Sequence, residues 1–224
     1  MTVFEFDVNS PAWNAQDLFI IGFHGLAGSG KDTAANIVAD LLPNINERVA
    51  FATKMKESVC ALLECSPRWL ELNKANPDVK IHIYDKNNAD WDHSIIPLPP
   101  MPLRRFLQLF GTEAHRGVFG DDFWVDQLFQ QMERILSQQP SPVWLISDVR
   151  FANEARRIHV NEGLIVEILR PGHSFDSKLM QHLSENDAKT KKYVTHTVIN
   201  DGSVEQLREK LIELLTRISW LRTV

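Results

Sequence analysis

Several features are scarce in this chain of 224 residues, and each scarcity argues against a class of protein. The sequence has only two cysteines, Cys60 and Cys65, which fit no zinc-ligand spacing and fall in one predicted helix. A framework of disulfide bonds is therefore not expected. No apolar run approaches the roughly 20 residues that a transmembrane helix needs, so we expect no membrane partner.

An excess of basic residues is also missing. Lysine and arginine together number 24 against 29 acidic residues, which gives a formal net charge of −5. Without a general basic field, the chain is not expected to bind nucleic acid. Residues 1–17 combine neither a basic start nor an apolar core, so we expect no signal peptide and a cytoplasmic location.

What the chain does contain is a glycine-rich loop at residues 25–33, with the sequence GLAGSGKDT. It fits the P-loop pattern G-x-x-x-x-G-K, which binds phosphate groups. The apolar residues 18–23 before it predict a buried parallel strand. Residues 31–42 after it have the apolar periodicity of a helix that stops at Pro43. A strand, a glycine loop and a helix in this order aim backbone N–H groups at an anion.

The residue types in the loop suit phosphate binding. Glycines let the chain curve closely around a phosphate group, and Lys31 offers a point charge to the outer phosphates. Thr33 offers a hydroxyl for a metal ion. A glycine-rich turn that binds nothing is the alternative. The residues that we expect to bind the nucleotide here are Gly25, Gly28, Ser29, Gly30, Lys31 and Thr33.

Asp32 is unusual because serine or threonine usually follows the P-loop lysine. A carboxylate beside bound phosphates repels them unless Mg²⁺ or a basic partner lies between the two. As a catalytic candidate, Asp32 could organise the water shell of the metal or orient an acceptor phosphate. Alternatively, it is simply an acid that is favoured at the N-terminus of a helix.

Predicted strands alternate with predicted helices along the rest of the chain. Such alternation predicts an α/β fold with a parallel, mostly five-stranded sheet flanked by helices. Residues 66–102 lie between the helix expected after Thr53 and the helix expected at 103–110. They hold six of the eleven prolines, so we expect little regular structure there. The further strands are expected at 47–52, 143–146, 164–169 and 197–199, and the further helices after Thr53, at 103–110 with a break at Gly111, at 124–136, at 152–161 and after a Ser203–Gln206 capping box.

Polar residues follow two of these strands and are expected to meet the P-loop at one edge of the sheet. Asp148 comes after an apolar strand, where P-loop enzymes place an acid that holds Mg²⁺. It could instead cap the next helix. Arg150 could neutralise charge on a transferring phosphoryl group, or it could form a surface ion pair. Arg170 follows the fourth strand.

A second group of candidates lies before and at the start of the 124–136 helix. The guanidinium groups of Arg104, Arg105 and Arg116 suit phosphate oxygens, and at least one is expected to hold an acceptor phosphate. Trp124 or Phe123 could stack on a base, although packing in the core is the alternative. Farther along, a polar segment could be either a lid over the phosphates or a solvated loop, and its lysines are Lys178, Lys189, Lys191 and Lys192.

Seven stretches, taken together and in order, resemble the bacteriophage deoxynucleoside monophosphate kinases, which are relatives of adenylate kinase. The combination of G-K-D-T in the loop with D-V-R-F after a strand is more specific than either motif alone. Ala152 departs from the resemblance, since a proline is expected there, and residues 66–102 match nothing in it. The stretches are 25–33, 105–113, 124–125, 148–155, 170–172, 182–185 and 199–203.

The resemblance implies a single P-loop kinase domain over 1–224. Its core would comprise about 18–52, 140–170 and 196–224, with an acceptor-binding insert at about 53–139 and a lid at about 171–195. It also implies phosphoryl transfer from ATP, with Mg²⁺, to a deoxynucleoside monophosphate. Lys31 would then bridge the donor phosphates, Asp148 would serve the metal, Arg150 would contact the transferring phosphoryl group, and Asn200 and Gly202 would lie near the donor base.

Two other readings stay open. A small-metabolite kinase, similar to a dephospho-coenzyme A kinase, would use the same core, and a nucleotide-binding module without catalysis would share the loop. A GTPase switch is disfavoured because residues 73–76 read NKAN and lack the aspartate of N-K-x-D. The accepted bases and the assembly also stay open, with a homodimer as one arrangement. If the protein is encoded by a phage, its location would be the host cytoplasm.

Overall fold

The computed structural model describes residues 19–42, 45–81, 100–136, 143–172 and 189–221. The backbone divides into two units. We call residues 1–51 with 128–224 the sheet unit and residues 52–127 the helical unit, and each is described by itself. Of the predicted lid, positions 173–188 lie outside the described residues, and so does the stretch 82–99 of the proline-rich segment.

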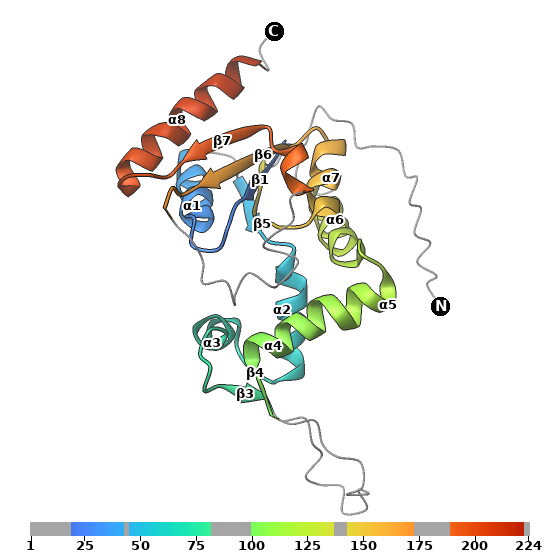
Figure 1. Ribbon diagram of the computed structural model, residues 1–224. Helices are drawn as coiled ribbons and strands as arrows, with labels where there is room; N and C mark the ends of the chain where they lie inside the picture. The colour runs from blue at the N-terminus through green and yellow to red at the C-terminus, as the bar shows by residue number, and fades with distance from the viewer. Residues whose placement is uncertain (1–18, 43–44, 82–99, 137–142, 173–188, 222–224) are drawn as a thin grey trace, which may run out of the picture. The chain divides into compact units, whose positions relative to one another are not determined.

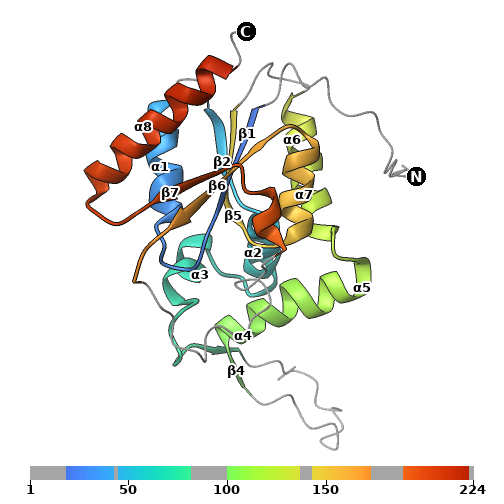
Figure 2. The same cartoon turned by 45° about the horizontal axis from the view of Figure 1, so that its top comes forward.

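The sheet unit is built on five parallel strands in the order β2-β5-β1-β6-β7 (Figures 1 and 2). The first strand of the chain is thus the central one, with a later strand on each side. This arrangement confirms the α/β fold with a parallel five-stranded sheet. The strands are β1 (Phe19–His24), β2 (Ile45–Val49), β5 (Val143–Val149), β6 (Leu164–Leu169) and β7 (His196–Ile199).

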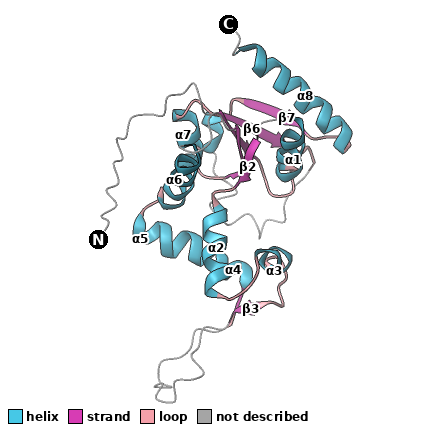
Figure 3. Ribbon diagram, turned by 180° about the vertical axis from the view of Figure 1, so that it is seen from behind, coloured by secondary structure: helices cyan, strands magenta, loops and turns pink. Residues whose placement is uncertain are grey.

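Helices cover both faces of this sheet, as Figure 3 shows. Helices α1 (Lys31–Leu41) and α8 (Val204–Leu221) lie on one face, and α7 (Ala152–Val160) lies on the other, beside the end of α6 (Phe123–Leu136). Because both faces are covered, the strands are apolar on both sides. The core between the sheet, α1 and α8 includes Ile21, Phe23, Ala35, Leu145, Val166 and Leu211.

The helical unit has its own small core. Val59 of α2 (Ala52–Leu62), Leu70 of α3 (Pro67–Asn73) and Leu103 of α4 (Leu103–Gln108) are each at most 1% exposed. Two short strands, β3 (Lys80–Ile81) and β4 (Met101–Pro102), pair in antiparallel fashion. The chain then continues through the π-helix η1 (Leu109–Arg116) and α5 (Gly117–Phe119).

The predicted break at Gly111 is wrong, because helical structure runs from Leu103 through to Phe119. Gly111 lies inside the π-helix, close to the Met55 side chain, and its carbonyl accepts a hydrogen bond of 2.7 Å from the Trp124 indole. This tertiary packing overrides the weak helix propensity of glycine. Thr112 therefore lies within the π-helix and does not begin a new turn.

Of three smaller predictions, two are wrong and one is confirmed. Helix α3 begins inside the segment expected to be irregular, where the Ser66 hydroxyl accepts a hydrogen bond from the Trp69 amide at 3.1 Å. Helix α2 begins at Ala52, so Thr53 lies within it and is not its cap. The Ser203–Gln206 capping box is confirmed by two reciprocal hydrogen bonds, of 2.8 and 3.3 Å.

In the described part of the chain, no helix is long and apolar enough to cross a membrane.

Candidate active site

The P-loop leaves the end of β1 and curves through conformations that only glycine adopts readily. Gly25, Gly28 and Gly30 have φ angles of 143°, 75° and 100°. A Cβ atom on Gly25 would lie 2.5 Å from the Ile168 carbonyl oxygen, and one on Gly30 would lie 2.5 Å from the Asn200 amide nitrogen. All three glycines are therefore needed for backbone conformation, and Gly25 and Gly30 are needed for space as well.

Polar groups inside the loop are arranged to receive a ligand. The Asn200 side chain donates a hydrogen bond of 2.8 Å to the Ser29 carbonyl, and Lys31 Nζ donates one of 2.7 Å to the Leu26 carbonyl. The Ser29 hydroxyl is only 2% exposed and has no hydrogen-bond partner among the described residues. Because buried polar groups in proteins nearly always have partners, this hydroxyl fits a phosphate oxygen.

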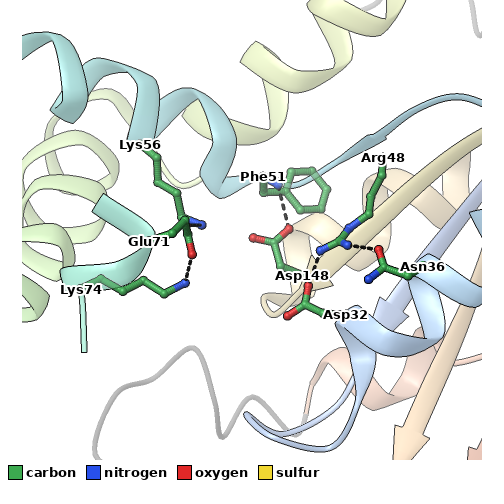
Figure 4. A network of polar contacts seen from close by, with 8 residues as sticks. All are labelled: Asp32, Asn36, Arg48, Phe51, Lys56, Glu71, Lys74 and Asp148. Carbon is green, nitrogen blue, oxygen red and sulfur yellow. Dashed lines mark hydrogen bonds and ion pairs between the residues drawn. The ribbon is translucent and has the colours of Figure 1, made fainter. Parts of the chain in front are cut away.

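The carboxylate of Asp32 has a basic partner in Arg48 of β2 (Figure 4). One guanidinium nitrogen lies 2.6 Å from Asp32 Oδ1, and the other donates to the side-chain oxygen of Asn36. Arg48 thus joins the second strand to the first turns of α1. The pair offsets the repulsion that a carboxylate exerts on phosphates at this helix N-terminus.

The carboxyl end of β5 is held by a set of partly buried hydrogen bonds. Asp148 Oδ1 accepts one of 2.8 Å from the Phe51 amide, just past the end of β2 (Figure 4). Glu154, which is 4% exposed, accepts the amides of Arg150 and Phe151 at 2.7 and 2.9 Å. Glu154 therefore holds the backbone just before α7, and a capping role for Asp148 stays a prediction.

The residues at the ends of β1 and β5 fit a magnesium nucleotide. Mg²⁺ usually takes one or two protein carboxylates and completes its shell with phosphate oxygens and waters. Asp148 offers such a carboxylate, and Thr33 offers a hydroxyl on α1. Among the described residues, no three His, Cys, Asp or Glu side chains form a metal cluster, and a magnesium ion held mainly by phosphates needs none.

The ends of β6 and β7 lie side by side at the same edge. Arg170 follows β6 and is exposed. The backbone N–H of Asn200 donates a hydrogen bond of 2.8 Å to the Leu169 carbonyl. Leu169 and Ile199 are paired in register and are 42% and 45% exposed, so this corner is apolar. Gly202 follows at the turn into α8, against the Gln206 side chain. Because β1 lies between β5 and β6, the P-loop, Asp148, Arg150 and Arg170 all leave one edge of the sheet.

The four candidate acceptor residues all lie in the helical unit. Arg105 contacts Glu113 at 3.2 Å, and Arg116 Nε lies 3.5 Å from Asp121. Arg104 is exposed. Trp124 is 8% exposed, as a side chain packed in a core would be. Its stacking on a base stays a prediction.

A cluster of aromatic rings surrounds His115 in the π-helix. Ring centroids of Phe110, Trp124 and Phe123 lie 4.3, 5.0 and 5.5 Å from that of His115. His115 Nδ1 also lies 2.5 Å from the Phe110 carbonyl. Phe119, at 6.0 Å, is 65% exposed. The sequence contains these aromatic residues, but no pattern in it predicts that their rings pack around His115.

The lysines assigned to a lid have separate surroundings. Lys178 lies outside the described residues. Lys191 forms an ion pair of 3.1 Å with Glu167 of β6, and Lys192 lies 4.8 Å from the centre of the Tyr193 ring. Lys189 is exposed immediately before the short 3-10 helix η3 (Thr190–Tyr193). Whether they close over a nucleotide stays a prediction.

Several residues that organise the site were missed by sequence analysis. Thr190 is fully buried and donates a hydrogen bond of 3.1 Å to the Arg150 carbonyl. The His24 imidazole lies next to the P-loop, with Nδ1 2.9 Å from the Val149 carbonyl. Burial lowers the pKa of His24 below its ordinary 6.5. Glu154 could have been found, since an acid three residues after a helix start predicts a capping interaction, whereas Arg48 had no local signal.

With this geometry in place, comparison with known proteins is informative. Residues 70–211, more than half of the chain, match the family described as "Deoxynucleotide monophosphate kinase". The chain belongs to this family. The match confirms the resemblance that we drew from the motifs. It begins within the helical unit and continues through β5, β6, β7 and the first part of α8.

Individual relatives are distant but cover most of the chain. The deoxynucleoside-5'-monophosphate kinase of Escherichia phage T5 is 25% identical in an alignment of 235 positions, and the alignment covers 81% of this chain and 89% of that protein. A relative from Acanthamoeba polyphaga mimivirus is 26% identical over 216 residues, which cover 90% and 98%.

Among solved structures, the dephospho-CoA kinase of Campylobacter jejuni is 16% identical, with a TM-score of 0.47 over 92% of this chain and 98% of that one. The shikimate kinase of Acinetobacter baumannii is 13% identical, with a TM-score of 0.40 over 90% and 93%.

Proposed function

We propose that this protein transfers the γ-phosphoryl group of ATP to a deoxynucleoside monophosphate and so produces the diphosphate. The observation that carries the proposal is the family match, in a chain whose P-loop contains a buried serine hydroxyl with no hydrogen-bond partner in the described part of the structure. The reaction asks little covalent chemistry of a protein. Positioning and electrostatic stabilisation supply most of the catalysis.

In the sheet unit, we assign the P-loop to the donor phosphates. The backbone of Gly25, Gly28, Ser29 and Gly30 would surround them, and Lys31 would release the Leu26 carbonyl to contact them. Asp32, neutralised by Arg48, would organise the water shell of the metal or orient an acceptor phosphate.

The ends of β5, β6 and β7 supply the other roles on the donor side. Asp148, with Thr33, would hold Mg²⁺, which would neutralise negative charge on the phosphates. Arg150 would contact the transferring phosphoryl group. Arg170, Asn200 and Gly202 would surround the donor base, beside the apolar corner that Leu169 and Ile199 form.

In the helical unit, we assign Arg104, Arg105 and Arg116 to the acceptor phosphate and Trp124 to the acceptor base. Arg105 and Arg116 each rest on an exposed acid, Glu113 and Asp121. Both members of the Arg105–Glu113 pair are exposed, and such pairs are worth little, so a phosphate can replace Glu113 at small cost. We also propose that residues of about 53–139 form the acceptor-binding insert and about 171–195 the lid.

The test is a panel of deoxynucleoside and ribonucleoside monophosphates, each incubated with ATP and Mg²⁺, with dephospho-coenzyme A as an additional acceptor. We expect diphosphate only with one or more deoxynucleoside monophosphates and slow ATP hydrolysis without an acceptor, because closure on the acceptor completes the site. ATP consumption that is equally fast with and without acceptors, with no diphosphate formed, would contradict the proposal. Phosphorylation of dephospho-coenzyme A alone would indicate the small-metabolite kinase.

We further propose that the protein acts in the cytoplasm, on small molecules and without nucleic acid. If a phage encodes it, this is the cytoplasm of the host. A homodimer is one arrangement to test by light scattering of the purified protein with and without ATP and Mg²⁺.

A further inference from the structure

The imidazole of His24 connects the entry of the P-loop to the loop that carries two proposed catalytic groups. His24 is the last residue of β1 and directly precedes Gly25. Its Nδ1 atom lies 2.9 Å from the carbonyl oxygen of Val149, 125 positions later. Val149 stands between Asp148 and Arg150, so one hydrogen bond joins both halves of the donor site.

The strand pairing is irregular at this point. Gly22 is in register with Ile146, and His24 is in register with Val149, so two steps along β1 face three steps along β5. The extra residue lies in the stretch of Ser147 and Asp148. A bulge of this kind redirects the side chains that it carries, and bulges are frequent beside active sites. Here it falls at the proposed magnesium ligand.

A bulge interrupts the ladder of backbone hydrogen bonds, and the His24 ring supplies a bond at the interruption. The ring is favoured in its neutral form because burial lowers the pKa of His24. Glu167 pulls this pKa upward, while Lys31 and Lys191 pull it downward. In the neutral ring, the Nδ1–H group donates to the Val149 carbonyl, which leaves Nε2 without a proton.

We propose that His24 is a positioning residue, which fixes the bulge of β5 against the P-loop and thereby holds Asp148 and Arg150 toward the donor phosphates. The proposal rests on the function proposed above, and no role in proton transfer is assigned to the ring. The alternative is that His24 only fills space at the end of the strand. The two differ because only the positioning role predicts a specific loss of magnesium-dependent ATP binding.

The test compares two variants at this position. His24→Asn keeps an N–H donor on the atom that corresponds to Nδ1, whereas His24→Leu removes the donor and keeps similar bulk. The exposed His159→Asn, on the outer part of α7, is the matched control. Circular dichroism and thermal unfolding establish that each variant is folded. Turnover, KM for ATP and for the acceptor, and ATP affinity with and without Mg²⁺ are then measured.

We expect His24→Leu to reduce turnover by about a hundredfold, the scale for misplacing reacting groups by about 1 Å. It should also lose most of the gain in ATP affinity that Mg²⁺ gives, while the affinity without Mg²⁺ and the KM for the acceptor change by less than about threefold. His24→Asn should recover at least about a tenfold part of the lost turnover, because it restores the hydrogen bond.

The proposal is overturned if His24→Leu folds and keeps both its turnover and its magnesium-dependent gain in affinity. It is also overturned if Asn and Leu reduce them equally. Failure of the parent protein to make any nucleoside diphosphate would refute the proposed function instead. In that case, the magnesium-dependent gain in ATP affinity still decides the role of His24, since it needs no acceptor.

Discussion

Single residues at the donor site are held by partners far away in the sequence. Asn200 donates to the Ser29 carbonyl, His24 contacts the Val149 carbonyl, and Asp148 accepts the Phe51 amide. Their sequence separations are 171, 125 and 97 positions. The sequence predicted the glycine-rich P-loop and the position of Asp148 near the end of a strand, because both patterns are local. It could not predict these contacts, because a single chain without its fold does not reveal which distant groups meet.

Replacing Lys31 with alanine should reduce turnover by at least about a hundredfold, the scale for removing a preorganised charge-stabilising group. The fold should survive, since Lys31 is not a buried residue and the change removes a charge rather than core packing. Steady-state kinetics with the best acceptor, beside a thermal unfolding curve, measure both effects. Lys74→Ala, in an exposed ion pair of α3, is the control. Near-normal turnover of folded Lys31→Ala would remove the P-loop from the mechanism.

Replacing Asp148 with asparagine should impair magnesium-dependent turnover more than ATP binding without the metal. Asparagine keeps the Oδ1 atom that accepts the Phe51 amide, so the change removes charge and leaves the local structure in place. The measurement is a Mg²⁺ titration of turnover, with the exposed Asp40→Asn of α1 as control. If the titrations of variant and parent coincide at equal maximal rates, Asp148 has only a structural role.

The Arg48–Asp32 pair makes a prediction about two residues together. Arg48→Gln should weaken ATP binding several-fold, because it leaves the Asp32 carboxylate unneutralised beside the phosphates. Adding Asp32→Asn should then restore part of the lost affinity. Isothermal titration with ATP and Mg²⁺ across the double-mutant cycle measures the coupling. A double variant that binds ATP no more tightly than Arg48→Gln would show that Asp32 does not face the nucleotide.

At the scale of elements, the predictions succeeded where one local pattern dominated. The predicted strand 164–169 coincides with β6, and the long helix at 124–136 begins one residue earlier, at Phe123. They failed where packing decided the outcome. Gly111 stays helical because its own unit surrounds it, and α3 forms among the prolines because Pro67 stands at its first turn, where proline is tolerated.

The cap of α3 can be tested by itself. Ser66→Ala removes the side-chain oxygen that accepts the Trp69 amide. The free energy of unfolding should fall by about 1 kcal/mol, the usual effect of losing a serine cap. Urea denaturation followed by circular dichroism measures the change. Ser58→Ala is the control, because the Ser58 hydroxyl bonds to a carbonyl within its own helix and no cap is lost. Equal effects of the two substitutions would contradict the assignment.

At the scale of the whole molecule, the sequence predicted the class of fold and the family, because strand and helix alternation and ordered motifs extend over most of the chain. It predicted little regular structure at 66–102, where α3 forms, and it did not predict the separate core of the helical unit. The sequence could not predict which acidic residue forms an ion pair with each arginine. Arg105 and Arg116 contact acids of their own unit, and no periodicity marks which acid meets which arginine.

The order of the strands has a consequence for synthesis on the ribosome. β1 is made first but is the central strand, and its neighbours β5 and β6 are made more than a hundred residues later. Until then, Ile20, Ile21 and Phe23, all at most 1% exposed in the finished sheet, have no strands to cover them. Contacts so distant in sequence form slowly and leave apolar segments open to aggregation. The nascent chain therefore depends on its later half to bury β1, and the hydrogen bond from Asn200 to the Ser29 carbonyl of the P-loop can form only after β7 has been made.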